Sequence, residues 1–223
     1  MPSLREPYPE ILQALRAQYG RPPLPSVEGE FEAVVRAYLE HQAGESKARV
    51  VLEMMRDAGV LDAQALAEID AEELSTLVGV TRKPPRWAGV LRRLAAWYVE
   101  RGEAEGLQEV ATEQLRESLR AINGLGPGSV DVVLLRGLNR AAMPVDRASA
   151  RVLIRHGWID SSQDYDEIRQ TLEGLAPDDP EALSMLASGL EQVATKFCKP
   201  AKPRCEGCPL RPWLPESGPI DLM

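Results

Sequence analysis

The chain has 223 residues, enough for one large domain or two small ones. It contains no apolar run long enough to cross a bilayer and no charged-then-apolar signal segment at its N-terminus, which disfavours membrane and secreted proteins and predicts a cytoplasmic one. The formal net charge of −8, taken alone, argues against a nucleic-acid-binding protein.

Apolar side chains recur at helical spacing along almost the whole chain, and no segment alternates with period two for long enough to predict a strand. The spacing predicts helices over residues 8–19, 28–42, 45–58, 63–69, 71–78, 84–101, 113–121, 127–138, 146–156, 164–173 and 180–197. Asp62, Asp70 and Thr112 are predicted helix N-caps. The expected fold class is therefore all-α.

A glycine turn, Gly124-Leu125-Gly126, separates two of these helices. Two glycines so close together allow positive φ angles and a close backbone approach. The next helix starts at Pro127 or Gly128, so its free N–H groups would face the turn and could bind a phosphate. An ordinary connection between two helices explains the same residues.

Asp146 precedes the helical segment 146–156 and is a plausible N-cap for it. A carboxylate in that place could also stabilise a sugar cation or activate a water molecule. The two roles are compatible.

Basic residues are concentrated in three segments, although the total charge is negative. Residues 80–101 carry six basic residues against one acidic residue, residues 120–155 carry six against two, and residues 196–211 carry five against one. Each segment alone could be a solvated face, whereas three together favour an anionic partner.

All three cysteines lie between residues 198 and 208, at Cys198, Cys205 and Cys208. Three clustered cysteines do not form a disulfide framework, and in a reducing compartment such thiols more often bind a metal.

Four stretches together resemble the helix-hairpin-helix DNA glycosylases of the endonuclease III superfamily. They are INGLGPGSVDVVL, PVDRASARVL, KFCKPAKPRCEGCPL and FEAVVRAYLEHQ, and their order and spacing match the family. The hairpin, with Asp131 behind it, is closer to the endonuclease III-related and 3-methyladenine branch. The resemblance implies a two-lobed fold with a cleft for a bent duplex. One lobe is a six-helix bundle over residues 28–143, and the other combines residues 1–27 with 144–223.

The resemblance implies a base-excision repair DNA glycosylase that flips damaged bases, with Asp146 as its catalytic carboxylate. It assigns DNA contacts to the hairpin, to the end of the helix 28–42 and to basic residues near Asp146 and the cysteines. These are Gly124, Leu125, Gly126, Gly128, Gln42, His41, Arg147, Arg151, Lys199, Lys202 and Arg204. Gln42 would fill the gap left by the flipped base. His41 could enter the same gap or face solvent, and Arg147 and Arg151 could bind phosphates or pair with Asp146.

The chain departs from the bifunctional members of the family at one position. Those members carry a lysine nucleophile 18 residues before the aspartate, and that position is Gly128 here. No lysine occurs between residues 84 and 195. An active protein is therefore expected to be monofunctional, without lysine-dependent strand cleavage. A family member that binds DNA or abasic sites with little or no catalysis is the alternative, and an unrelated helical interaction protein is disfavoured.

The cysteine loop also departs from the family at one position. Cys198, Cys205 and Cys208 match the first three ligands of its [4Fe–4S] loop, but the fourth position is Leu214. A cluster would need water, a carboxylate or another donor on one iron. A [3Fe–4S] form or a loop held by packing alone are alternatives, and zinc is disfavoured because a structural zinc site is closed by four ligands.

The expected partner is double-stranded DNA with a damaged base or an abasic site. The chain is expected to act as a monomer, without membrane contact, in the cytoplasm in association with the nucleoid.

Overall fold

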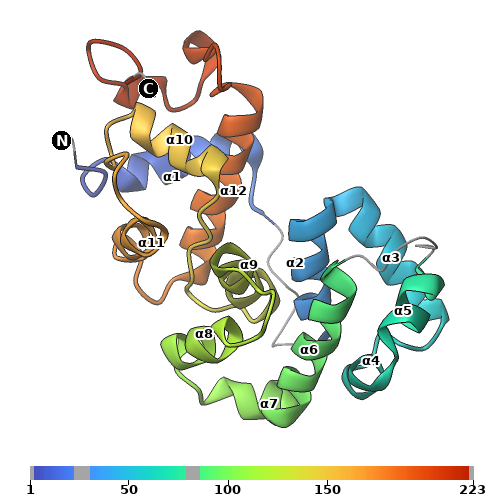
Figure 1. Cartoon of the computed structure of the whole chain (residues 1–223). Coiled ribbons are helices and arrows are strands. Elements are labelled where there is room, and N and C mark those ends of the chain that lie inside the picture. Colours follow the sequence, from blue (N-terminus) through green and yellow to red (C-terminus); the bar gives the residue numbers. More distant parts are fainter. Residues whose placement is uncertain (1–2, 23–30, 79–85, 221–223) are drawn as a thin grey trace. The chain divides into compact units, whose positions relative to one another are not determined.

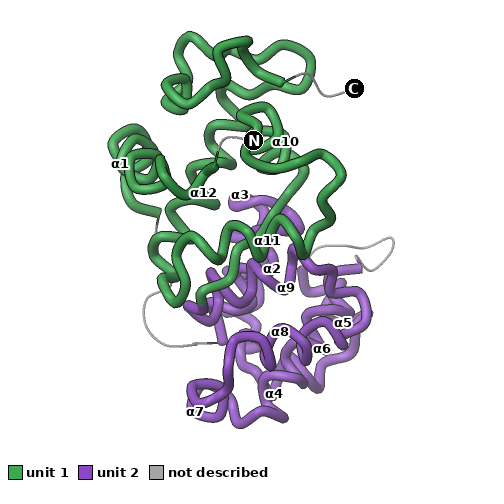
Figure 2. Tube along the Cα trace, turned by 90° about the vertical axis from the view of Figure 1, so that its left-hand side faces the viewer, with its two compact units in different colours: residues 1–24, 141–223 green, residues 25–140 purple. Residues whose placement is uncertain are grey.

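The structure is a computed structural model that describes residues 3–22, 31–78 and 86–220 (Figure 1). The described residues form helices joined by short loops and contain no β-strand, which confirms the all-α prediction. Among them, no helix is both long and apolar enough to cross a membrane. The chain divides into two compact units, Met1–Leu24 with Ala141–Met223, and Pro25–Arg140 (Figure 2). We call them the terminal unit and the central unit.

The central unit contains eight described α-helices and one turn of π-helix. They are α2 (Phe31–Ala43), α3 (Glu45–Asp57), α4 (Ala63–Glu68), α5 (Ala71–Leu77), α6 (Arg86–Glu100), α7 (Glu103–Gln108), α8 (Thr112–Arg120), α9 (Pro127–Val132) and η1 (Val133–Gly137). Helix α2 packs against α3, α6, α9 and η1, and its Val34, Val35 and Leu39 are fully buried. This helix is therefore the centre of the unit, because several elements bury apolar side chains against it.

The terminal unit is built from helices that come from both ends of the chain. They are α1 (Tyr8–Tyr19), α10 (Arg147–Arg155), α11 (Tyr165–Glu173), α12 (Pro180–Lys196) and the short 3₁₀ turns η2 (Cys205–Gly207) and η3 (Arg211–Trp213). Helix α12 packs against both α1 and α10. A Cβ on Gly189 of α12 would lie 2.6 Å from Leu15 Cδ1 of α1, so glycine allows these two helices to approach closely.

The predicted helices agree with the observed ones to within a few residues wherever the chain is described, and Asp62 and Asp70 accept the backbone hydrogen bonds expected of N-caps. The prediction for Thr112 is wrong. Thr112 is the first residue of α8, and the N-cap is Ala111, which makes no side-chain hydrogen bond. Helix α7 was not predicted. Residues 28–30 and 84–85 of two predicted helices lie outside the described residues.

The predicted helix 127–138 changes its winding halfway. It is α-helical to Val132 and continues as a π turn, in which the Leu138 amide donates to the Val133 carbonyl at 2.9 Å. Gly137 lies in this turn, and a Cβ there would be 2.9 Å from Val34 Cα of α2. The irregular turn thus lies where the backbones of two elements almost touch.

Candidate active site

The glycine turn joins α8 to α9 and is fixed against α6. Arg93 of α6 donates its Nε–H to the Asn123 carbonyl at 3.0 Å, and Leu125 is buried with its amide bonded to the Ile122 carbonyl. Gly124 has a φ of +89°, a conformation that favours glycine. Of the two glycines, only Gly124 uses this freedom, because Gly126 has a φ of −76°, which is open to any residue.

Helix α9 begins directly after this turn, as the sequence predicted. Gly126 is its N-cap and provides no side-chain hydrogen bond, and Pro127 has no N–H group. The first amides of the helix are therefore not satisfied within it, and they can bind an anion such as a phosphate.

The end of α2 brings two further predicted residues to the start of α9. Gln42 donates from Nε2 to Ser129 Oγ at 3.0 Å, across 87 positions of sequence. A Cβ built on Gly128 would lie 3.8 Å from His41 Nε2, an ordinary contact. Both side chains are exposed at this point. Gln42, His41, Gly128 and the hairpin thus form one continuous surface of the central unit.

The space around Gly128 shows that glycine is not required there by packing. Its nearest neighbours beyond the helix are the His41 ring atoms, at 3.8 and 4.0 Å, and its φ is not in the left-handed region. A Cβ at this position would therefore make only ordinary van der Waals contacts.

Asp146 is the N-cap of α10 in the terminal unit, as predicted. Its Oδ1 accepts a hydrogen bond from the Ser149 amide at 2.6 Å, and the residue is exposed. Arg147 beside it is exposed, whereas Arg151 one turn later donates from Nε to the Cys198 carbonyl at 2.9 Å. The cap holds the carboxylate in one orientation at the solvent-accessible start of the helix.

The three cysteines follow α12 and lie around one pocket. Its lining consists of Arg155, His156, Phe197, Cys198, Pro203, Cys205, Cys208, Leu214 and Pro219. Burial raises the pKa of the Cys205 and Cys208 thiols, and the charges of neighbouring cysteines raise it further. Of the basic residues nearby, Lys202 and Arg204 are exposed, and Lys199 is half-buried with Nζ on the Thr195 carbonyl.

Arg155 of α10 holds the start of this cysteine loop. It is 6% exposed and donates to the carbonyls of Lys199 and Pro200, both at 2.6 Å, and to Cys198 Sγ at 3.4 Å. None of the carboxylates in the described ranges forms an ion pair with it. Arg155 therefore joins α10 to the start of the cysteine loop and places a buried positive charge beside Cys198.

His156 is a residue of this pocket that the sequence analysis missed. Its Nδ1 lies 2.8 Å from the Val152 carbonyl, its ring stacks on Trp158, and its Nε2 is buried without a hydrogen-bond partner. Burial lowers the pKa of His156, although the carbonyls of Val152 and Leu210 partly offset this. Only the fold brings it to the cysteines, because the nearest of them is Cys198 and lies after α12.

Three thiols, a buried cation and no carboxylate in the lining are a donor set that fits an anionic iron–sulfur cluster. Within the described ranges, no three Cys, His, Asp or Glu side chains converge closely enough to hold a single metal ion.

Comparisons with known proteins show the family of the chain. A family model described as HhH-GPD superfamily base excision DNA repair protein matches residues 34–178. A protein of Methanocaldococcus jannaschii, provisionally named a DNA repair glycosylase, is 26% identical over 205 residues, which are 91% of this chain and 93% of that protein.

Two solved structures show the same fold. A trapped endonuclease III–DNA covalent intermediate aligns with a TM-score of 0.70 at 19% identity and covers 94% of both chains. The 3-methyladenine DNA glycosylase of H. pylori, bound to 1,N6-ethenoadenine, aligns with a TM-score of 0.66 at 20% identity, over 85% of this chain and 97% of that one. The chain belongs to the HhH-GPD superfamily and is a base excision repair DNA glycosylase of the endonuclease III type.

Proposed function

We propose that this glycosylase is monofunctional and removes a damaged base from double-stranded DNA by hydrolysis, without cleaving the strand through a lysine. The observation that carries the proposal is Gly128. It stands where bifunctional members have their nucleophile, and a Cβ at this position would make only ordinary contacts with the His41 ring. An arginine cannot replace the amine, because it stays protonated.

Asp146 is the catalytic carboxylate in this proposal. Once the damaged nucleotide is flipped out of the stack, the departing base leaves an oxocarbenium-like sugar. A fixed carboxylate stabilises this cation or accepts the proton of the attacking water. The hydrogen bond from the Ser149 amide to Oδ1 supports the role, because it orients the carboxylate before the substrate arrives.

The DNA contacts are proposed in three groups. The hairpin residues Gly124, Gly126 and Gly128 bind a phosphate through backbone amides, and the buried Leu125 anchors the hairpin, because its own amide is bonded to the Ile122 carbonyl. Gln42 and His41 fill the gap left by the flipped base, for which Gln42 exchanges its bond to Ser129 for one to DNA. The basic residues bind further phosphates, and they are Arg147, Arg151, Lys199, Lys202 and Arg204.

Borohydride trapping tests the absence of the lysine reaction. The wild type is expected to give no covalent adduct with lesion-containing duplex, since no amine is available at Gly128. Gly128→Lys is expected to fold, because a Cβ there has ordinary contacts, and to give a trappable Schiff base. An adduct with the wild type would contradict the proposal.

Two substitutions separate the catalytic role of Asp146 from its role as a helix cap. Asp146→Asn keeps a good N-cap, so the free energy of unfolding should stay within about 0.5 kcal/mol, while base release should fall at least about 100-fold. Asp146→Ala should lose the activity and also about 1 kcal/mol of stability. Chemical denaturation and single-turnover base release measure the two effects. Activity retained by Asp146→Asn would exclude the carboxylate as catalyst.

The missing lysine and the net charge of −8 also favour a second function, that of a member which binds DNA or abasic sites with little catalysis. No base release from oxidised, alkylated and mismatched substrates, together with measurable binding to abasic duplex, would establish it.

We propose further that Cys198, Cys205 and Cys208 hold a [4Fe–4S] cluster, as the resemblance to endonuclease III implies. When bound, the cluster would supply a rigid cross-link rather than a reactive centre. Arg155 and Arg151 support this role, because both already bind backbone carbonyls of the loop that carries Lys199 and Lys202. We propose that the protein acts as a monomer in the cytoplasm, associated with the nucleoid.

A further inference from the structure

The cysteine pocket contains three thiols and lacks the fourth. Leu214, in the position where the family has its last cysteine, lines the pocket with an apolar side chain. An iron–sulfur cluster in proteins is normally held by four protein ligands. A cluster in this pocket would therefore have one iron without a thiolate.

His156 is the polar side chain in the pocket that lacks a partner. It is 3% exposed, and its Nε2 forms no hydrogen bond with the part of the chain that the structure describes. A buried polar atom without a partner is costly, and in a native fold it often marks the place of an ion or ligand.

The other ring nitrogen decides which tautomer is present. Nδ1 lies 2.8 Å from the Val152 carbonyl, which can only accept, so Nδ1 carries the proton. In a neutral ring Nε2 then carries the lone pair. The Leu210 carbonyl is close enough to raise the pKa of the ring as an acceptor, but Nε2 makes no hydrogen bond of acceptable geometry with it.

A histidine that binds a metal typically has this arrangement. One nitrogen is the ligand, and the other donates to a backbone carbonyl that fixes the orientation of the ring. The stacking on Trp158, at 4.4 Å between ring centroids, holds the imidazole from a second side.

We infer that His156 Nε2 is the fourth ligand of the cluster, beside Cys198, Cys205 and Cys208. The inference rests on the proposed cluster. Three thiolates bring negative charge into the pocket, whereas a neutral imidazole brings none. The buried Arg155, whose Nη1 lies 3.4 Å from Cys198 Sγ, offsets part of that charge.

A second unpartnered group lies near the cysteines. The Tyr19 hydroxyl is buried without a hydrogen bond, and its pKa is raised by burial and by the charge of Cys208. Tyr19 is not among the residues that line the pocket, whereas His156 is. Tyr19→Phe is therefore the matched control, because it removes the competing donor and leaves the ring in place.

The experiment uses the full chain, purified or reconstituted with iron and sulfide without oxygen, and then reduced. Pulsed electron paramagnetic resonance should detect a nitrogen directly bound to the cluster, and labelling histidine with ¹⁵N should change that signal. The chain has two histidines, so His41→Gln assigns the signal. The nitrogen signal should persist in His41→Gln and in Tyr19→Phe. Leu214→Cys, which provides a fourth thiolate, should keep the iron and abolish the signal.

The possible failures are distinguishable. A cluster without histidine nitrogen coupling in the wild type would overturn the assignment of His156 and leave the proposed cluster intact. A protein that binds no iron would overturn both the proposed cluster and the assignment of His156. The proposed glycosylase reaction would still stand, because base release is measured in a separate assay. The decisive measurement is made on the wild type, so it does not depend on the folding of a His156 variant.

Discussion

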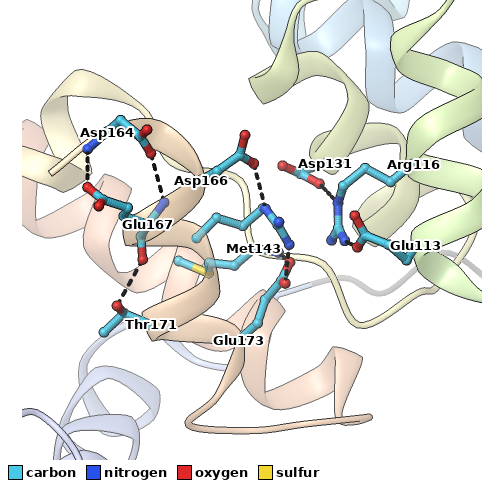
Figure 3. Close-up of polar contacts among 10 residues, drawn as sticks. Glu113, Arg116, Asp131, Met143, Asp164, Asp166, Glu167, Thr171 and Glu173 are labelled. Carbon is cyan, nitrogen blue, oxygen red and sulfur yellow. Dashed lines mark hydrogen bonds and ion pairs between the residues drawn. The ribbon is translucent and has the colours of Figure 1, made fainter.

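At the scale of single residues, the central unit contains a buried ion pair, whose two charges carry a large desolvation cost. Arg116 of α8 and Asp131 of α9 have side chains 3% and 0% exposed, and Arg116 Nε donates to Asp131 Oδ1 at 2.8 Å. Arg116 also pairs with Glu113 on its own helix (Figure 3). The pair joins the two helices of the hairpin, so it fixes the turn between them from inside the fold.

Removal of Asp131 should be costly, because the buried Arg116 guanidinium would lose its fully buried carboxylate partner. We expect Asp131→Ala to lower the free energy of unfolding by about 3 kcal/mol. Urea denaturation measures the change, with an unchanged m-value as the sign that stability alone is affected. Glu53→Ala is the control, since Glu53 and its partner Arg49 are exposed and their pair should contribute under about 1 kcal/mol. Equal effects of the two substitutions would contradict the special role of the buried pair.

At the scale of elements, aspartate caps start the helices and glycines set how closely they pack. Side chains of Asp62, Asp70, Asp146, Asp164 and Asp179 each accept a backbone hydrogen bond at the start of a helix. Asp164 forms a full capping box with Glu167 (Figure 3). Such signals are local, so the sequence predicted these helices well. The π turn depends instead on the contact with α2, which no local pattern contains.

Gly137 tests the packing of η1 against α2. A Cβ there would be 2.9 Å from Val34 Cα, and backbone cannot yield as a side chain can. We expect Gly137→Ala to cost about 1–3 kcal/mol. Gly89→Ala in the interior of α6 should have the opposite effect and stabilise by about 0.5–1 kcal/mol, since its Cβ would meet only the Arg93 guanidinium, at 3.5 Å. The midpoint temperatures of thermal unfolding of the two variants should shift in opposite directions from that of the wild type. A shift in the same direction would refute the packing argument.

At the scale of the whole molecule, charge distribution matters more than net charge. The total of −8 would repel DNA, but basic residues are gathered around Asp146 and the cysteine loop. Affinity for DNA should therefore come from a few phosphate contacts and should fall steeply with salt.

The exposed loop residues Lys202 and Arg204 test this expectation. The double variant Lys202→Ala/Arg204→Ala should bind duplex more weakly and lower the slope of log K against log salt by about 2, because each phosphate contact contributes about 1. Fluorescence anisotropy across a salt series measures the slope. Arg16→Ala/Lys47→Ala changes the net charge equally at two other exposed sites. If both double variants lowered the slope alike, net charge and not the loop would govern binding.

The sequence by itself determined the helices, most of their caps, the all-α class and the glycosylase family, because spacing, capping and motif order are encoded along the chain. It also located Gly128 and Leu214, where the family pattern is broken. Only the tertiary structure showed the space beside Gly128 and brought Gln42 and His41 to the hairpin.

The contribution of Arg155 and His156 to the cysteine pocket was likewise decided by the fold. These contacts join residues on different elements, and they form only when apolar faces far apart in the sequence are buried together. A buried nitrogen without a partner is not visible in any local pattern, since burial itself is a property of the packed unit.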